Sequence, residues 1–347
     1  MIAFLSINKY LRGNIARVLN FALVAILAVI LVGFVVPTVL HQGTSYLLEI
    51  TILGIANGAI YALIALGYTM VYGIIELINF AHGDVFTLGG FISLPVIGLL
   101  GLTSATPLFL TIAGLALVFV VVMGITGMVN VAIERIAYRP LRNSPRLAPL
   151  ITAVGMSFVI EGIMYIVSGP QNVHYPDLLP TARISLGNGV SVGVKDIIVV
   201  VIAILLVILL TLFVGRSKLG KAMRATAQDR DAAQLMGIDI NRTISATFFI
   251  GAALAAAGGI IFGLYFNTLT FDLGFSIGLF AFTAAVFGGI GNIQGAALGG
   301  LVIGLIRAFN DGYFASQWTD VIIFAVLILV LVFRPTGLLG SPVTDKA

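Results

Sequence analysis

The sequence has no cysteine, a single tryptophan and few charged residues. Only 9% of its 347 residues are Asp, Glu, Lys or Arg, whereas an ordinary soluble domain has about 25%. Without cysteine the chain has no disulfide, thiolate nucleophile or cysteine metal site. The shortage of charge excludes a secreted or cytosolic enzyme and a nucleic-acid-binding domain, because too few charged side chains remain to cover a surface in water.

Hydrophobic residues make up 60% of the chain and occur in long runs, such as residues 21–36, 197–214 and 321–333. These runs approach the roughly 20 residues that a helix needs to cross a bilayer. The sequence therefore predicts an all-α polytopic membrane protein of about ten segments. The predicted segments lie near residues 18–36, 46–72, 84–102, 107–132, 150–168, 197–215, 243–265, 277–290, 293–309 and 321–333.

Two of these segments have alternatives. The first follows Lys9, Arg12 and Arg17 as a signal peptide would, but it is longer than the usual apolar region of about 7–15 residues, so we interpret it as a retained helix. The 277–309 stretch is two short segments, one long tilted helix, or a helical hairpin that enters and leaves on one side of the membrane. One helix would place the C-terminus on the opposite side of the membrane.

The basic residues indicate an orientation, since cytoplasmic loops retain Lys and Arg. Residues 1–17 contain three, 133–149 four, 216–242 six and the tail from 334 two, which is fifteen of the eighteen. These four regions fall on one side if the ten segments alternate. We therefore expect both termini to be cytoplasmic.

Two polar breaks share a pattern. Residues 79–84 (Asn-Phe-Ala-His-Gly-Asp) precede Leu-Gly-Gly at 88–90, and residues 291–294 (Gly-Asn-Ile-Gln) precede Leu-Gly-Gly at 298–300. The pattern is either a parallel repeat with both breaks near the cytoplasmic ends of their spans, or a coincidence in a chain with 40 glycines. Because polar backbone at membrane depth is tolerated only against protein or water, both breaks are candidates for a transport path.

Ionisable residues within or near the spans are also candidates, because hydrocarbon makes them costly. They are Glu49, Glu76, His82, Asp84, Glu161 and Arg307. Glu161 lies in mid-span and is expected to point inward, whereas His82 has either a hydrogen-bonding or a proton-relay role. The predicted path residues are Asn79, His82, Gly83, Asp84, Glu161, Asn292 and Gln294. The three histidines are far apart, so no metal site is expected.

The 216–242 loop is the most charged part of the chain. Residues 221–236 lack Pro and Gly, which predicts a short helix on the cytoplasmic face. That helix is a lipid-binding element, a solvated connector or a docking site for a partner; its small Ala residues favour close protein contact. Residues 215–222 nearly match a phosphate-binding loop, but Ala222 lacks the required hydroxyl and no β-strand precedes it. We therefore expect no nucleotide hydrolysis by this chain.

Several motifs closely resemble the LivH subunit family, the permeases of bacterial high-affinity branched-chain amino acid ABC transporters. The resemblance covers about residues 46–342 and includes residues 67–84, 133–142 (Ile-Glu-Arg-Ile-Ala-Tyr-Arg-Pro-Leu-Arg), 151–157, 223–237, 282–292 and 335–340. It implies a fold like that of the vitamin B12 and ribose importers (type II-like) in the bacterial inner membrane. The implied parts are an added N-terminal helix within 1–45, a permease domain at 46–340 and a cytoplasmic tail at 341–347.

The resemblance also implies partners. They are a LivM-like second permease, two ABC ATPases that bind ATP and Mg²⁺, and a periplasmic binding protein that delivers Leu, Ile or Val; this chain itself needs no cofactor. Asp231-Ala232-Ala233, followed by Gly237, resembles the EAA coupling motif of importer permeases, with Asp in place of Glu. With Arg224, these residues are expected to contact the ATPases, although the motif's downstream Ile-x-Leu-Pro is missing.

Other functions remain open at this stage. A secondary transporter would use His82, Asp84 or Glu161 for ion coupling, and a channel would need a filter, which is not evident in the sequence. Within the ABC class, related permeases carry urea or other amides, or other amino acids, so the membrane subunit alone does not specify the substrate.

Overall fold

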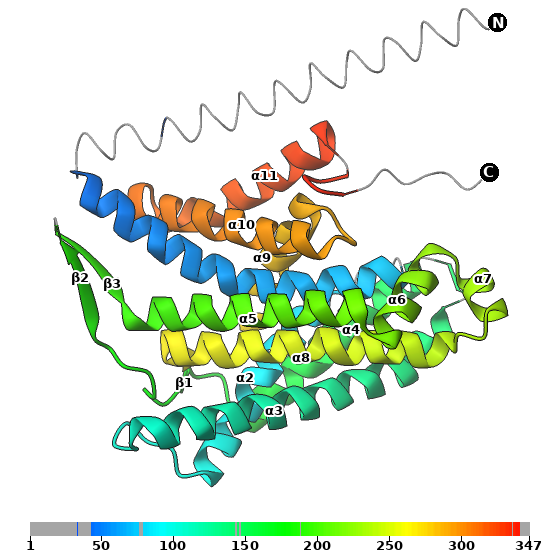
Figure 1. Ribbon diagram of the computed structural model, residues 1–347, viewed down its shortest axis with the longest axis horizontal. Coiled ribbons are helices and arrows are strands. Elements are labelled where there is room, and N and C mark those ends of the chain that lie inside the picture. Colours follow the sequence, from blue (N-terminus) through cyan, green and yellow to red (C-terminus); the bar gives the residue numbers. More distant parts are fainter. Residues whose placement is uncertain are drawn as a thin grey trace, which may run out of the picture.

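The computed structural model describes residue 33 and residues 43–340, except 76–78, 143, 146, 188 and 335. Almost all of the described chain is helical (Figure 1). The helices are Gly43–Ile75, α2 (His82–Leu99), α3 (Leu108–Ile133), α4 (Leu147–Ser168), α5 (Val194–Arg216), α6 (Lys218–Gln228), α7 (Arg230–Leu235), α8 (Ile240–Phe266), α9 (Leu273–Gly288), α10 (Ile293–Tyr313) and α11 (Thr319–Phe333).

Among the described residues, eight helices are long and apolar enough to cross a membrane, and α9 is a shorter apolar helix. These nine correspond to nine of the ten predicted segments; the tenth, 18–36, lies outside the described residues. The 277–309 stretch forms two helices, α9 and α10, so the single-helix alternative is wrong. The chain turns there because Gly289 and Gly291 adopt positive φ angles of 108° and 91°, which glycine tolerates readily.

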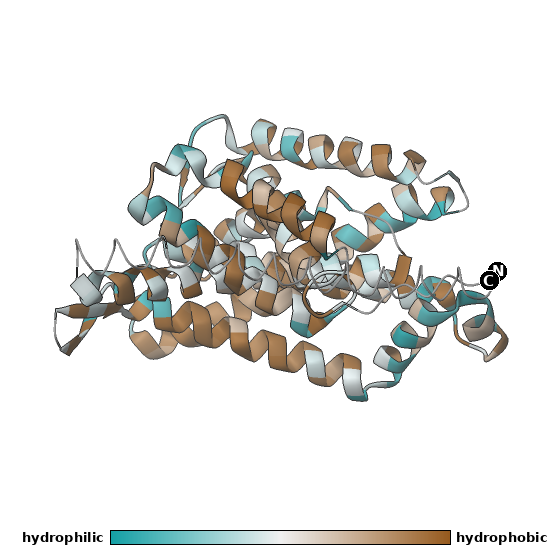
Figure 2. Cartoon of the chain, turned by 90° about the horizontal axis from the view of Figure 1, so that it is seen from above, coloured by the Kyte–Doolittle hydropathy of each residue, from teal (hydrophilic) through white to brown (hydrophobic). Residues whose placement is uncertain are grey.

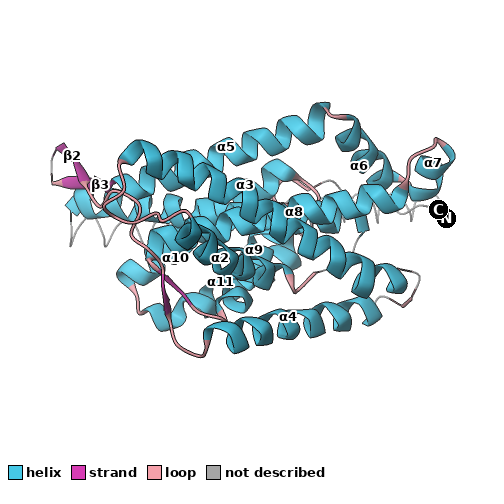
Figure 3. Ribbon diagram, turned by 90° about the horizontal axis from the view of Figure 1, so that it is seen from below, coloured by secondary structure: helices cyan, strands magenta, loops and turns pink. Residues whose placement is uncertain are grey.

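Short strands lie at the end of the bundle opposite α6 and α7 (Figure 3). In one hairpin β2 (Arg183–Gly187) pairs antiparallel with β3 (Val190–Gly193), so that Arg183 faces Gly193. In the other pair β1 (Val173–His174) lies antiparallel to β4 (Thr268–Leu269), with Val173 opposite Leu269. We call this the strand end of the bundle, and the other the α6–α7 end.

The centre of the bundle consists of the Gly43–Ile75 helix and α8, which are mostly buried, whereas α3, α4, α5 and α11 expose most of their surface. The exposed side chains on these outer helices are largely apolar, including Phe109, Val120 and Ile166. Hydrophilic residues are concentrated toward the two ends of the bundle (Figure 2). This distribution suits a lipid bilayer, because apolar side chains on the outer surface of the bundle are then in contact with hydrocarbon instead of water.

Glycine contacts show how the central helices run. A Cβ on Gly300 would lie 2.4 Å from the Ala62 Cα, and one on Gly304 would lie 2.2 Å from the Gly58 Cα. Hence α10 runs antiparallel to the Gly43–Ile75 helix at close backbone approach, as small residues permit in membranes. Likewise Gly89 meets Ala256 and Gly90 approaches Gly259, so α2 and α8 run in the same direction.

These directions reveal an inverted arrangement. The Gly43–Ile75 helix runs toward the α6–α7 end and α2 turns back, whereas α8 runs toward the strand end and α9 turns back. The helices that follow, α3 and α4 in the first set and α10 and α11 in the second, are also opposite in direction. The two helices that carry the Leu-Gly-Gly sequences, α2 and α10, both run toward the strand end, as predicted for breaks in the same direction, and the parallel repeat itself stays a prediction. Both sequences occur where a helix packs closely on another.

Candidate functional site

The 79–84 break lies inside the bundle. Asn79, His82 and Asp84 are all buried, and His82 lies against Gly67 and Gly251. Gly67 is eight residues from the end of its helix at Ile75, which corresponds to a depth of about 12 Å. The expectation that this break lies near the end of its span is therefore wrong. The chain returns to mid-bundle before α2 begins.

His82 fills a space that two glycines create. A Cβ on Gly67 would lie 2.1 Å from the His82 Nε2, and the ring makes an edge contact with Tyr68 at 4.7 Å between centroids. Neither ring nitrogen has a hydrogen-bond partner of ordinary geometry among the described residues. His82 is thus tightly packed within the break.

Asp84 connects α2 to α4. The Ser157 hydroxyl of α4 donates to the Asp84 Oδ2, while the Asp84 Oδ1 has no hydrogen-bond partner among the described residues. Glu161 follows Ser157 by one helical turn and is half-exposed. Thus Asp84 and Glu161, predicted separately, lie near each other at the same face of α4.

Two helix N-termini meet beside Asp84. Asp84 lies in the first turn of α2, and a Cβ on Gly274, in the first turn of α9, would lie 2.5 Å from the Asp84 Oδ1. Gly83 makes the crossing possible, because a Cβ there would lie 2.1 Å from the Gly274 carbonyl oxygen. The positive ends of both helix dipoles stabilise a carboxylate at this point.

The 291–294 break is a turn between α9 and α10 at the α6–α7 end. Asn292 accepts a hydrogen bond from the Gly295 N–H at 3.0 Å and donates to the Leu339 carbonyl at 2.8 Å. Gln294 is exposed. The structure brings Asn79, His82, Gly83, Asp84 and Glu161 together and places Asn292 and Gln294 elsewhere.

The 216–242 segment forms two helices where the sequence predicts one. Asp229 has extended backbone angles and its side chain accepts a hydrogen bond from the Ala232 N–H at 3.0 Å, so it ends α6 and caps α7. Such capping is typical of Asp. Gly237 then adopts a positive φ of 82° before α8 begins.

The predicted coupling residues have different environments. Asp231 and Ala232 are exposed, Ala233 is buried, and Arg224 donates a hydrogen bond to the Val214 carbonyl at the end of α5. Sequence reasoning missed Leu235 and Met236, whose exposed fractions are 88% and 83%. The sequence does contain a signal for these two residues, because two large apolar side chains precede a glycine in an otherwise polar segment.

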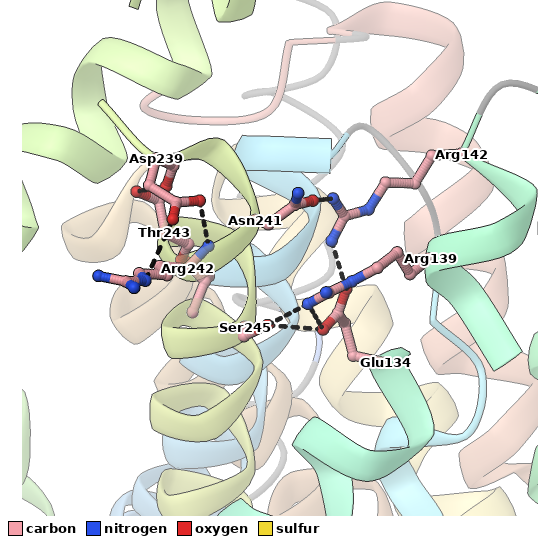
Figure 4. A network of polar contacts seen from close by, with 9 residues as sticks. Glu134, Arg139, Arg142, Asp239, Asn241, Arg242, Thr243 and Ser245 are labelled. Atoms are coloured by element: carbon pink, nitrogen blue, oxygen red, sulfur yellow. Dashed lines mark hydrogen bonds and ion pairs between the residues drawn. The ribbon is translucent and has the colours of Figure 1, made fainter. Parts of the chain in front are cut away.

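A buried ionic cluster, which sequence reasoning also missed, lies beside this segment (Figure 4). Glu134 begins a π-helical turn, Glu134–Tyr138, that extends α3. Its fully buried carboxylate pairs with Arg139 at 3.0 Å and with Arg142, and it accepts a hydrogen bond from Ser245 of α8 at 2.7 Å. Burial lowers the pKa of the Arg142 guanidinium, and the Glu134 carboxylate opposes that shift. The i, i+5 and i, i+8 spacing of these residues was the available signal.

The strand end has its own polar contacts. Lys195 bridges Asp177 at 2.7 Å and Asn267 at 2.8 Å, and the hydrogen bond from Lys195 lowers the pKa of Asp177. A cavity of about 390 Å³ lies nearby, lined in part by Arg183, Asp196 and Tyr265. This end therefore presents a structured polar surface.

Comparison with known proteins agrees with this architecture. Residues 50–331 match the family described as branched-chain amino acid transport system, permease component. The chain is 45% identical over 299 residues to the high-affinity branched-chain amino acid transport system permease protein BraD of Pseudomonas aeruginosa, covering 84% of this chain and 95% of that protein.

Two further relatives have related descriptions. Escherichia coli K12 LivH, a high-affinity branched-chain amino acid transport system permease protein, is 41% identical over 305 residues, covering 87% of this chain and 98% of LivH. A probable branched-chain amino acid transport permease of Methanocaldococcus jannaschii is 28% identical, covering 80% and 88%. No solved structure matches the chain. The chain is a multi-pass membrane protein that belongs to the branched-chain amino acid transport system permease family.

Proposed function

We propose that this chain is one membrane subunit of an ATP-driven importer of leucine, isoleucine and valine. It forms the translocation path with a second, LivM-like permease, and two cytoplasmic ATPases supply the energy. The observation that carries the proposal is the buried 79–84 break, which lies in mid-bundle and connects α2 to α4 through Asp84 and Ser157. The names of the relatives support the substrate class over urea or other amides.

The α6–α7 end is the cytoplasmic side in this proposal. Ten of the thirteen described Lys and Arg residues belong to the segments at this end, which supports that orientation. They are Arg135, Arg139, Arg142, Arg216, Lys218, Lys221, Arg224, Arg230, Arg242 and Arg334. Both termini are then cytoplasmic, the membrane is the bacterial inner membrane, and the periplasmic binding protein docks at the strand end.

The ATPases bind the tip of α7. Leu235 and Met236 project from the bundle with almost no intramolecular cover, and large exposed apolar side chains together mark an interaction site. Asp231 and Ala232 lie on the same exposed element, whereas buried Ala233 supports α7 from within. Bulky substitution at Ala233 would therefore displace α7 as well as uncouple transport.

ATP and Mg²⁺ are held by the partner ATPases. The 215–222 segment, which resembles a phosphate-binding loop, forms the end of α5 and the start of α6. A Cβ on Gly220 would lie 2.3 Å from the Val214 carbonyl oxygen, so this glycine serves helix packing. A phosphate-binding loop instead follows a β-strand.

Uptake of labelled leucine into proteoliposomes that contain this chain and all its partners tests the proposal. We expect ATP-dependent uptake that excess isoleucine and valine inhibit and excess urea does not. Uptake without the ATPases would instead establish a secondary transporter, and inhibition by urea alone would establish an amide permease.

The docking surface is tested by the double substitution Leu235→Ser with Met236→Ser. We expect the ATPases no longer to co-purify, since the variant removes the exposed apolar contact. The matched control is Ile184→Ser with Leu186→Ser, two exposed apolar residues on β2 at the opposite end. Normal ATPase binding by the α7 variant would disprove this docking site.

A further inference from the structure

We infer that Arg230 is a positioning residue that transmits movement of α7 to the buried 79–84 break. This inference rests on the proposed function, because it concerns how ATPase docking at α7 reaches the path. Arg230 is the first residue of α7 and is partly buried. Its Nη2 donates a hydrogen bond to the Ile74 carbonyl oxygen at 2.9 Å, across 156 residues of sequence.

The Ile74 carbonyl, which accepts this hydrogen bond, lies close to the 79–84 break along the chain. Ile74 lies near the end of the described Gly43–Ile75 helix, and the C-terminal end of a helix attracts cations. The chain that follows this helix end leads within four residues to Asn79. A shift of α7 therefore moves the end of the helix from which the break emerges.

The break is also held from its other side. Tyr138, the last residue of the π-helical turn, donates a hydrogen bond from its hydroxyl to the Asn79 Oδ1 at 2.8 Å. The same ring lies 5.6 Å from that of Phe248 in α8. Asn79 is thus connected to α3 and α8, while the helix before it is connected to α7.

The two connections differ in strength. The π-helical turn is fastened to α8 by the buried Glu134 cluster, in which Arg139 and Arg142 also bind Ser245 and Asn241 of α8 (Figure 4). Among the described residues, the Arg230 side chain makes one hydrogen bond, to a backbone carbonyl. The cluster therefore acts as a fixed support, and the Arg230 contact is the movable link.

Space for movement exists under the docking helices. A cavity of about 80 Å³ lies between the end of the Gly43–Ile75 helix and α6, beside the α9–α10 turn, with Gly73, Met223 and Gly291 among its lining residues. Closure of this cavity would bring α6 onto the helix end that Arg230 holds. The geometry thus connects the docking helices first to the end of the Gly43–Ile75 helix and then to the 79–84 break.

The experiment compares Arg230→Met, Arg230→Lys and Arg242→Met in the complete reconstituted transporter. Arg242 is the matched control, because it is a highly exposed arginine at the same end and pairs, among the described residues, with Asp239 three positions before it. We expect Arg230→Met to retain ATPase binding and ATP hydrolysis within twofold, while leucine uptake per ATP falls at least tenfold. Lys retains a donor, so Arg230→Lys should recover part of the coupling, and Arg242→Met should match the wild type.

Unchanged uptake per ATP in Arg230→Met would overturn the inference. Loss of ATPase co-purification would also overturn it, since Arg230 would then be a docking contact. A wild-type complex that fails to take up leucine would instead contradict the proposed function itself. A second measurement uses Phe80→Cys, which introduces one cysteine into this cysteine-free chain. The maleimide reactivity of that cysteine should change when ATP is added, and it should not change when Arg230→Met is also present.

Discussion

The two polar breaks have similar sequences and very different surroundings. The 79–84 break enters the bundle, where Asn79, His82 and Asp84 are buried against the Gly43–Ile75 helix, α4, α8, α9 and the π-helical turn that extends α3. The 291–294 break stays at the α6–α7 end, where Asn292 caps a helix and Gln294 is exposed. The same residue types therefore build a site in one place and a turn in the other.

The position of each break in the bundle accounts for the difference. The first break returns to mid-bundle before α2 starts, and α9 likewise starts in mid-bundle, near Gly274, after the chain leaves α8. The counterpart of the 79–84 break is thus the connection between α8 and α9, which lacks a comparable sequence. Inverted arrangements place corresponding elements in opposite directions, so short motifs do not identify them.

Gly83→Ala against Gly291→Ala gives the largest expected difference between the breaks. A Cβ on Gly83 would lie 2.1 Å from the Gly274 carbonyl oxygen, and such overpacking against backbone costs about 3 kcal/mol or more. A Cβ on Gly291 would make an ordinary contact at 4.0 Å with the Gly73 Cα, but Gly291 has a φ of 91°, so alanine there costs about 1–2 kcal/mol. Thermal unfolding in detergent measures both, with Gly98→Ala, which meets no atom within 4 Å, as control. Equal losses at the two positions would contradict the close crossing of α2 and α9.

Asp84→Asn against Asn292→Ala separates the breaks by function. The Asp84 carboxylate faces two helix N-termini and anchors Ser157 of α4, so we expect its neutralisation to lower leucine uptake at least tenfold. Asn292→Ala removes a helix cap, which costs about 1 kcal/mol of stability and should change uptake less than twofold. Ser157→Ala should resemble Asp84→Asn if the connection between α2 and α4 matters. Uptake that falls equally in the Asn292 variant would place both breaks in the path.

Hydrophobic runs were sufficient to predict nine of the described helices, because membrane spans depend on local composition. Proximity was harder to predict. Asp84 on α2 and Glu161 on α4 are 77 residues apart in sequence, and only the bundle brings them together. Glu134 looked like part of a charged loop, since its burial depends on Arg139, Arg142 and Ser245. The two-helix form of residues 218–235 depends on one cap at Asp229, which a helix-propensity argument does not detect.

Asn79→Ala against Gln294→Ala gives the smallest pair of effects and sharpens the comparison most. Asn79 is buried and accepts the Tyr138 hydroxyl at 2.8 Å, so its removal leaves a buried phenol unpaired at a cost of about 1–3 kcal/mol. Gln294 is exposed at the start of α10, and its truncation should stay within about 0.5 kcal/mol. If Gln294 lines the path, as its sequence context predicts, Gln294→Ala will lower leucine uptake without lowering stability. If the break is only a turn, both quantities will match the wild type, while Asn79→Ala lowers both.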